Sequence, residues 1–207
     1  MRLALSVRPI GVKNKRMDLP CNAPDSAAQH RQAAPKKLRA AVMTLSTTRS
    51  KENDLGGKYI CDALAEAGHE IVWYEVVKDD APSIASMLCA LREHHELDIV
   101  VCTGGTGISP MDLTIDTARP LFDRELTAFG VMFTVLSHAE VGMACLLSRA
   151  TAGVMKDKVV FCLPGSPKAC KLAMEKIILP EAGHIVKHAR EKGRGQEAGV
   201  RRQENNG

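Results

Sequence analysis

The sequence predicts an α/β fold with a largely parallel sheet covered by helices on both faces. Three short apolar runs of strand character, at 38–45, 71–77 and 97–102, alternate with two segments of helical periodicity, at 55–67 and 84–91. Parallel strands joined by helices need right-handed crossovers, which place helices over both faces. A chain of 207 residues is long enough for one such domain with tails.

Each of these segments carries its own local signals. The run 38–45 is almost continuously apolar, as expected of a buried parallel strand. The helical stripe of 55–67 ends at Gly68, a residue typical of helix ends. Residues 71–77 are rich in β-branched and aromatic side chains, which favour a strand. The next helix has apolar residues at i, i+3, i+4 and i+7, namely Ile84, Met87, Leu88 and Leu91.

The second half of the chain is less regular but still alternates. Its apolar patterns are shorter, and Pro and Gly residues interrupt them. The expected elements are helices over 114–122 and 170–178, two short helices on either side of Ser137 within 129–147, and strands over 148–155 and 158–163.

Charge and composition divide the chain into three parts. Residues 1–37 hold 8 Lys/Arg against 2 Asp/Glu and several prolines, which predicts a basic, disordered N-terminal extension. Residues 38–190 hold 16 Lys/Arg against 19 Asp/Glu and form the predicted domain. Residues 191–207 form a polar, Gly-rich tail that is predicted to be flexible. For the extension, a targeting peptide and a true start at Met17 are the open alternatives.

Several function classes are disfavoured by composition. The basic residues lie in the tails and only 3% of residues are aromatic, which argues against nucleic-acid binding. No run of 18 apolar residues predicts a membrane span, and no secretory signal is expected, since no long apolar stretch of the kind found in such signals occurs. The seven cysteines form no C-x-x-C pair, so a zinc knuckle is not expected and the usage fits the reducing cytoplasm.

A glycine-rich loop follows the strand 97–102 and precedes a helix. Three glycines in five residues allow the main chain to turn sharply and to approach a ligand closely. Exposed N–H groups ahead of a helix favour an anion, so the loop predicts phosphate binding. A tight turn without a ligand is the alternative. The residues of the loop are Thr103, Gly104, Gly105, Thr106 and Gly107.

Acidic residues follow two of the predicted strands. Asp112 lies five residues past Gly107, and Asp79 and Asp80 lie just past the strand 71–77. If that strand neighbours the strand 97–102, both acidic spots face one cleft. Magnesium prefers one or two carboxylates together with phosphate oxygens and water, so these acids suggest a Mg²⁺ site. Capping of the next helix is the alternative for Asp79 and Asp80.

A second loop, after the strand 158–163, has similar features. Gly165 permits close approach of a ligand, and Ser166 either caps the next helix or binds a ligand. Lys168 is suited to neutralise a phosphate. Ser148 and Arg149 open the preceding strand, where Arg149 either binds phosphate or pairs with a surface acid.

The ordered motifs TGGTG, RPLFDRE, LSRA, AGV and LPGSPKA resemble those of molybdenum cofactor biosynthesis proteins of the MoaB/MogA type. The resemblance covers about residues 38–187 and is closest to the MoaB branch. It implies a three-layer αβα sandwich with a mostly parallel central sheet, assembled as a homo-oligomer, a trimer or a hexamer. It also implies molybdopterin and ATP as substrates, Mg²⁺ as cofactor and a molybdate-insertion protein as partner.

The resemblance also implies a reaction and roles for residues. The reaction is the Mg-ATP-dependent adenylylation of molybdopterin to adenylyl-molybdopterin, by a molybdopterin adenylyltransferase. A non-catalytic oligomer that binds and delivers molybdopterin is the alternative, because Met111 replaces an arginine common in the family and a proline is missing after Asp112. A nucleotide hydrolase related to competence-damage proteins is a third. Asp79 and Asp112 match the two functional, metal-holding aspartates; the glycine loop, Ser148, Gly165, Ser166 and Lys168 match the binding residues.

Overall fold

The computed structural model describes residues 34–191, so nearly all of the predicted N-terminal extension and nearly all of the predicted tail lie outside the described residues. The first half alternates strand and helix as predicted. Its elements are β1 (Arg39–Leu45), α2 (Leu55–Glu66), β2 (Glu70–Val77), α3 (Ala81–Glu93), β3 (Ile99–Thr103), α4 (Thr114–Ala118) and the short 3₁₀-helix η1 (Arg119–Leu121).

The second half completes the sheet and adds a long helical arm. Its elements are β4 (Arg124–Glu125), α5 (Thr127–Val141), the 3₁₀-helix η2 (Gly142–Leu147), β5 (Thr151–Met155), β6 (Lys158–Leu163), α6 (Pro167–Ala173), the π-helical turn η3 (Met174–Ile178) and α7 (Leu179–Arg190).

The six strands form one sheet in the order β2-β1-β3-β6-β5-β4. The first four strands in that order are parallel, and β5 and β4 are antiparallel to their neighbours. The prediction of a mostly parallel sheet is therefore confirmed. The condition given for the two acidic spots, that β2 and β3 are neighbours, is not met, because β1 lies between them.

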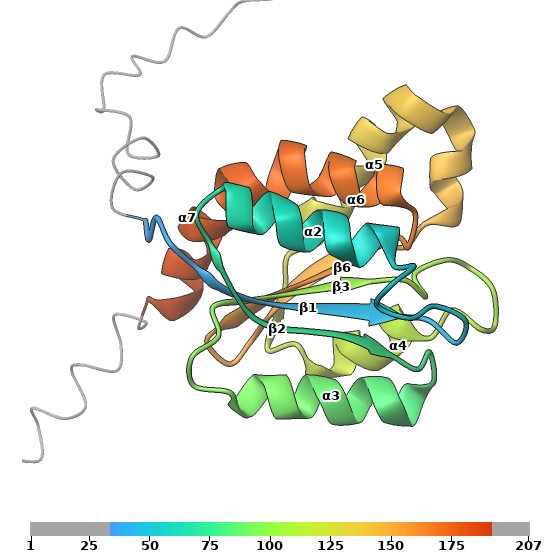
Figure 1. Cartoon of the computed structure of the whole chain (residues 1–207). Coiled ribbons are helices and arrows are strands. Elements are labelled where there is room, and N and C mark those ends of the chain that lie inside the picture. The colour runs from blue at the N-terminus through green and yellow to red at the C-terminus, as the bar shows by residue number, and fades with distance from the viewer. Residues whose placement is uncertain (1–33, 192–207) are drawn as a thin grey trace, which may run out of the picture.

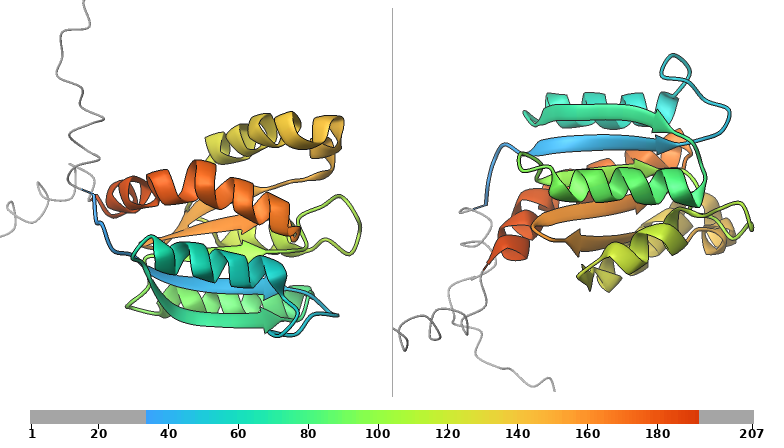
Figure 2. Two further views of the ribbon diagram at one scale, coloured as in Figure 1. Left: turned by 45° about the horizontal axis from the view of Figure 1, so that its top comes forward. Right: turned by 90° about the horizontal axis from the view of Figure 1, so that it is seen from below.

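Helices cover both faces of this sheet, as Figures 1 and 2 show. Alternate residues of β1 point to opposite faces, so that Val42 joins one core and Met43 the other. The first core includes residues of α2, α5, α6 and α7, and the second includes residues of α3 and α4. The three-layer αβα architecture is confirmed.

Three predictions of elements need correction. The segment expected to hold two short helices around Ser137 does hold two helical elements, but α5 runs through Ser137 and the break to η2 lies at Gly142, which adopts a φ of +60°. Serine is tolerated within a helix, whereas glycine readily takes a positive φ. Strand β4 was not expected, since it is two exposed, charged residues. The last helical segment was predicted to end at Ile178, yet it continues through η3 into α7.

The arm formed by α5 and η2 is unusually exposed for its composition. In Figures 1 and 2 it stands beyond α6 at the edge of the helical layer. Its 21 residues, Thr127–Leu147, are long and apolar enough to cross a membrane by length and composition alone. Phe129 and Phe133, however, are buried in the protein core. The opposite side of the arm is exposed and apolar.

Candidate functional site

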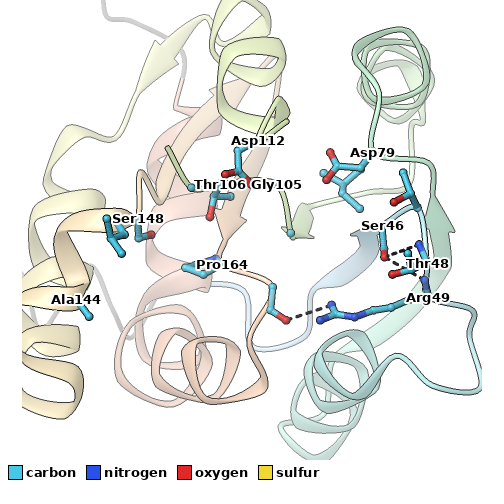
Figure 3. Close-up of a pocket in the computed structure, with 16 residues that line it drawn as sticks. Ser46, Thr48, Arg49, Asp79, Gly105, Thr106, Asp112, Ala144, Ser148 and Pro164 are labelled. Atoms are coloured by element: carbon cyan, nitrogen blue, oxygen red, sulfur yellow. Dashed lines mark hydrogen bonds between the residues drawn. The ribbon is translucent and has the colours of Figure 1, made fainter. Parts of the chain in front are cut away.

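A cleft of about 450 Å³ lies at the carboxyl ends of the parallel strands (Figure 3). Loops that follow β1, β2, β3 and β6 meet there with η2, because the carboxyl ends of parallel strands share one edge of a sheet. The lining residues are Leu45, Ser46, Thr47, Thr48, Arg49, Asp79, Gly104, Gly105, Thr106, Gly107, Asp112, Ala144, Leu147, Ser148, Pro164 and Gly165.

Two of the loop glycines have a backbone that other residues rarely adopt. Gly104 has φ +108°, and a methyl group there would lie 2.3 Å from the carbonyl oxygen of Leu45. Gly105 has φ +59°, and a methyl group there would lie 2.4 Å from Thr114 Oγ1 and 2.8 Å from Asp79 Oδ1. The loop therefore depends on glycine both for its conformation and for its close approach to the acidic side chains.

Asp79 has an environment that sets it apart from the other acids. Its Oδ1 atom is buried and has no hydrogen-bond partner among the described residues. Burial raises the pKa of this carboxyl, and the negative charges of Asp112 and Asp80 raise it further. A buried carboxylate oxygen without a partner is costly, so a bound cation or a proton stabilises it.

Asp80, the next residue in the sequence, makes structural contacts instead of facing the cleft. It caps the N-terminus of α3 by accepting a hydrogen bond from Ser83 N at 2.9 Å, and it forms an ion pair with Lys78. These contacts lower the pKa of Asp80 to about 2, with the Lys78 contact as the largest cause. Helix capping is therefore the role of Asp80, while Asp79 faces the cleft (Figure 3).

Asp112 reaches the same cleft from the loop that follows β3. One of its carboxylate oxygens accepts a hydrogen bond from Ser109 N at 2.9 Å, which fixes the turn. Its negative charge contributes to the raised pKa of Asp79, and both residues line the cleft. Thus the two acids share a cleft although β2 and β3 are not neighbours.

Arg149 does not line this cleft but holds its glycine loop in place. Its Nε donates to Gly107 O at 2.7 Å, and its Nη2 donates to Asp112 O at 2.8 Å. Its Nη1 binds both carboxylate oxygens of Asp116 at 2.9 Å. Of the two roles considered for Arg149, the pairing with an acid is the one observed.

Two residues predicted to bind a ligand make contacts within the fold. Thr103 is fully buried behind the cleft, where its hydroxyl donates to Pro164 O at 3.0 Å and contacts Cys170 Sγ at 3.2 Å. Thr103 thereby connects the two binding loops. Ser166 caps α6 by accepting from Ala169 N at 3.2 Å.

A second cavity of about 630 Å³ adjoins the first, between the α5–η2 arm and α6. Ser166 and Lys168 line it, and Ser148 and Pro164 line both cavities. Its walls are mostly apolar, with Phe133, Val141 and Leu172 among them. The predicted binding residues therefore divide between a polar cleft and an apolar pocket that share a wall.

The sequence reasoning assigned no binding role to the loop that follows β1. Arg49 is the one cation among the described residues that line the cleft, and its Nη1 donates to Gly165 O at 3.2 Å across the opening. Ser46 Oγ accepts from the backbone N–H groups of Thr48 and Arg49 and shapes the turn. The position of this loop at the carboxyl end of a strand was the only signal for it.

Known proteins share this fold. A family model described as "Probable molybdopterin binding domain" matches residues 41–184. The chain is 45% identical over 166 residues to Molybdenum cofactor biosynthesis protein B of Bacillus subtilis (strain 168), covering 80% of this chain and 98% of the relative.

Solved structures agree with these matches. A crystal structure of Molybdenum cofactor biosynthesis protein B has a TM-score of 0.74 and 42% identity, covering 77% of this chain and 99% of that one. The tungsten cofactor synthesizing protein MoaB from Pyrococcus furiosus has a TM-score of 0.68 and 44% identity, covering 76% of this chain and 100% of that one.

Proposed function

Because this chain belongs to the molybdopterin-binding family of molybdenum cofactor biosynthesis proteins, we propose that it is a molybdopterin adenylyltransferase. It transfers AMP from ATP to the terminal phosphate of molybdopterin. The observation that carries the proposal is the buried, unpartnered Oδ1 of Asp79, which lies beside the glycine loop in the cleft that Asp112 also lines.

The donor set of the cleft fits a magnesium ion that arrives with ATP. Within residues 34–191 no three His, Cys, Asp or Glu side chains gather closely enough to hold a metal alone. Magnesium seldom needs such a cage, since one or two carboxylates with phosphate oxygens and water suffice. Asp79 and Asp112 would supply those carboxylates. When bound, the ion neutralises charge on the ATP phosphates.

The remaining lining groups suit the transfer step. The main-chain N–H groups of Gly105 to Gly107 and the guanidinium of Arg49 would bind the phosphates and stabilise the charge of the transition state, whereas the N–H of Gly104 donates to Leu163 O within the sheet. A molybdopterin phosphate oxygen attacks the α-phosphorus of ATP, the bond to the β-phosphate oxygen breaks, and pyrophosphate leaves. Positioning of both substrates supplies much of the acceleration.

The adjoining apolar pocket suits the pterin. A ring system fits walls such as Phe133 and Leu172, and Lys168 offers a charge for the terminal phosphate. Because Ser148 and Pro164 line both cavities, a molybdopterin in the second cavity would place its phosphate next to ATP in the first.

A direct assay tests the proposal. The purified full chain, incubated with ATP, Mg²⁺ and molybdopterin, should release pyrophosphate and give a pterin whose mass increases by one AMP moiety. Omission of Mg²⁺ should abolish both products. A second candidate, binding and delivery without transfer, is favoured by Met111, which is 69% exposed next to Asp112 and supplies no positive charge for a phosphate. It predicts a bound but unmodified pterin in the same assay.

Arg49 provides a prediction within this proposal. Replacement of Arg49 by Gln should raise the KM for ATP and lower kcat/KM by about tenfold or more, because a charged hydrogen bond to phosphate is lost. The fold should persist, since Arg49 is exposed and makes one backbone contact, to Gly165. Steady-state kinetics of Arg49→Gln and Arg49→Lys check this, and unchanged kinetics in both would remove Arg49 from the site.

We also propose that the α5–η2 arm joins copies of this chain into a trimer or hexamer. Its exposed side carries large apolar residues that water would otherwise contact, and such patches commonly mark interfaces. These residues are Val131, Met132, Val135, Met143 and Leu146.

The double variant Val131→Lys/Val135→Lys tests this interface. These side chains are 62% and 59% exposed and lie one turn apart, so two lysines there should dissociate the oligomer without unfolding the subunit. Light scattering after size exclusion measures the mass. Leu55→Lys, at a residue 67% exposed on α2, is the matched control and should stay oligomeric. A monomeric unmodified chain that binds lipid vesicles would contradict the proposal.

We place the activity in the cytoplasm. Six cysteines of the described residues are free thiols, and Cys102 and Cys162 face each other on neighbouring strands without a disulfide. Free thiols in such a pair fit a reducing compartment, which also supplies ATP. A molybdate-insertion protein is the proposed recipient of the adenylylated product.

A further inference from the structure

A pair of histidines on α7 stands apart from the cleft. His184 and His188 are one helical turn apart, and their Nε2 atoms lie 3.0 Å from each other. Arg190, at the end of α7, binds the backbone carbonyls of Leu97 and Asp157, which lie just before β3 and β6. The pair therefore lies toward the amino ends of these strands, whereas the cleft lies at their carboxyl ends (Figure 1).

Both imidazole rings are oriented by carboxylates. His184 Nδ1 lies 3.2 Å from Glu181 Oε2, and His188 Nδ1 lies 2.9 Å from Glu191 Oε2. A carboxylate only accepts hydrogen bonds when ionised, so each Nδ1 carries the proton. In the neutral form of each ring, Nε2 then carries a lone pair, and the two Nε2 atoms are directed toward each other. Two lone pairs at 3.0 Å repel each other unless a proton or a cation lies between or beside them.

The distance between the Nε2 atoms suits a cation. Two imidazole nitrogens at about 2.0–2.1 Å from one metal ion are about 2.9–3.4 Å apart when the ligand angle is about 90–110°. Histidines that bind metals commonly donate Nδ1–H to a carboxylate, which fixes the tautomer and makes the ring a better ligand. The two glutamates supply that contact here.

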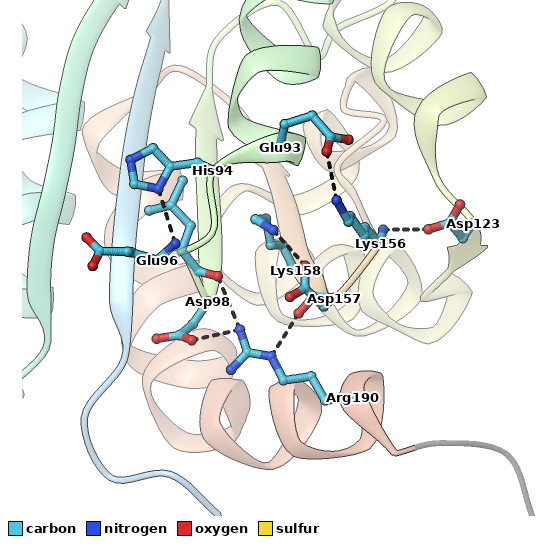
Figure 4. Close-up of polar contacts among 10 residues, drawn as sticks. Glu93, His94, Glu96, Asp98, Asp123, Lys156, Asp157, Lys158 and Arg190 are labelled. Carbon is cyan, nitrogen blue, oxygen red and sulfur yellow. Dashed lines mark hydrogen bonds and ion pairs between the residues drawn. The ribbon is translucent and has the colours of Figure 1, made fainter. Parts of the chain in front are cut away.

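The helix that presents the pair is firmly attached to the protein. Ala182 and Val186, on its other side, are fully buried. At its end Arg190 binds Asp98 Oδ1 at 2.7 Å and the carbonyl oxygens of Leu97 and Asp157 at 3.1 and 3.0 Å (Figure 4). Little ordering of the helix is then needed on binding, and preorganised ligands bind more tightly.

We propose that the His184–His188 pair binds a divalent transition cation such as Zn²⁺ or Ni²⁺. Imidazole ligands suit these ions, whereas Mg²⁺ prefers oxygen. In the part of the chain that the structure describes, no third ligand joins the pair, so water or another molecule completes the coordination. The site is independent of the proposed AMP transfer, because it needs none of the cleft residues.

Titration of the full chain with Zn²⁺ or Ni²⁺ alone tests this site. Calorimetry should detect one site in the unmodified chain, and His184→Ala and His188→Ala should each weaken binding at least about tenfold. In an imidazole ¹H–¹⁵N spectrum, the Nε2 signals of these two histidines should shift on addition of Zn²⁺. The matched control is His94→Ala/His95→Ala, which removes two exposed histidines and should leave binding unchanged.

Glu181→Gln separates a metal site from a histidine pair that merely shares a proton. It keeps both imidazoles, yet weaker orientation of His184 should lower metal affinity about tenfold. Circular dichroism verifies that the variants fold. Equal Zn²⁺ affinity in the unmodified chain and in the His184→Ala and His188→Ala variants, or Nε2 signals that do not move, would overturn the proposal and leave a shared proton between the rings.

Discussion

Asp79→Asn should reduce AMP transfer by at least about a hundredfold, and Asp112→Asn should do the same. Removal of one carboxylate that holds the metal costs several kcal/mol of transition-state stabilisation, and about 1.4 kcal/mol corresponds to a tenfold change in rate. The isosteric amide keeps the shape of the cleft but lacks the charge. Initial rates of pyrophosphate release with saturating Mg²⁺ and ATP measure the effect.

Asp80→Asn is the matched control for this prediction. Asp80 is adjacent in sequence but caps α3 and pairs with Lys78 rather than lining the cleft. Asparagine is also a good N-cap, so the fold should persist and AMP transfer should be nearly unchanged. Rates near those of the unmodified protein in Asp79→Asn or Asp112→Asn would remove these carboxylates from the mechanism.

The raised pKa of Asp79 predicts how stability and activity change with pH. The folded state binds its proton more tightly than the unfolded state, so ionisation of Asp79 destabilises the fold as pH rises above the usual aspartate value of 3.8. Asp79→Asn removes this cost, and without Mg²⁺ the variant should be more stable than the unmodified protein at neutral pH. In the unmodified protein, kcat/KM should fall as the pH is lowered, and the midpoint of this fall should lie above pH 3.8.

Local patterns were enough to predict much of the fold. Strands β1 to β3 and helices α2 and α3 follow from hydrophobic periodicity, which is read within a few residues. Strand order is different, because it depends on packing between distant segments. In the folded sheet β1 lies between β2 and β3, an order that the local patterns left open. Asp79 and Asp112 still line one cleft, since the carboxyl ends of all parallel strands share an edge.

The sequence predicted only those site residues that come soon after a recognisable strand. The glycine loop and Asp112 do so, and Asp79 follows β2. Arg49 was missed because its partner, the carbonyl of Gly165, is 116 residues away in sequence. The sequence also gave no sign that Thr103 lies behind the cleft, because its contacts with Pro164 and Cys170 form only in the folded sheet.

Gly104→Ala should be the most damaging change to the binding loop. At φ +108° an alanine is strained, and its methyl group would lie 2.3 Å from the backbone oxygen of Leu45, which cannot move without disturbing β1. Strain and overpacking together should cost about 3–5 kcal/mol. Urea unfolding measures this loss, which corresponds to a fall in Tm of about 10 °C for a domain of this size.

Gly68→Ala separates strain from contact. Gly68 also has a positive φ, +84°, but nothing lies within 4 Å of where its methyl group would be. The substitution should therefore cost about 1 kcal/mol, from backbone strain alone, and should leave AMP transfer unchanged. Gly104→Ala should lose transfer as well as stability, because displaced loop N–H groups no longer meet the phosphate. Equal losses in both variants would mean that the close approach to Leu45 contributes nothing, and the glycines would then serve the turn rather than the ligand.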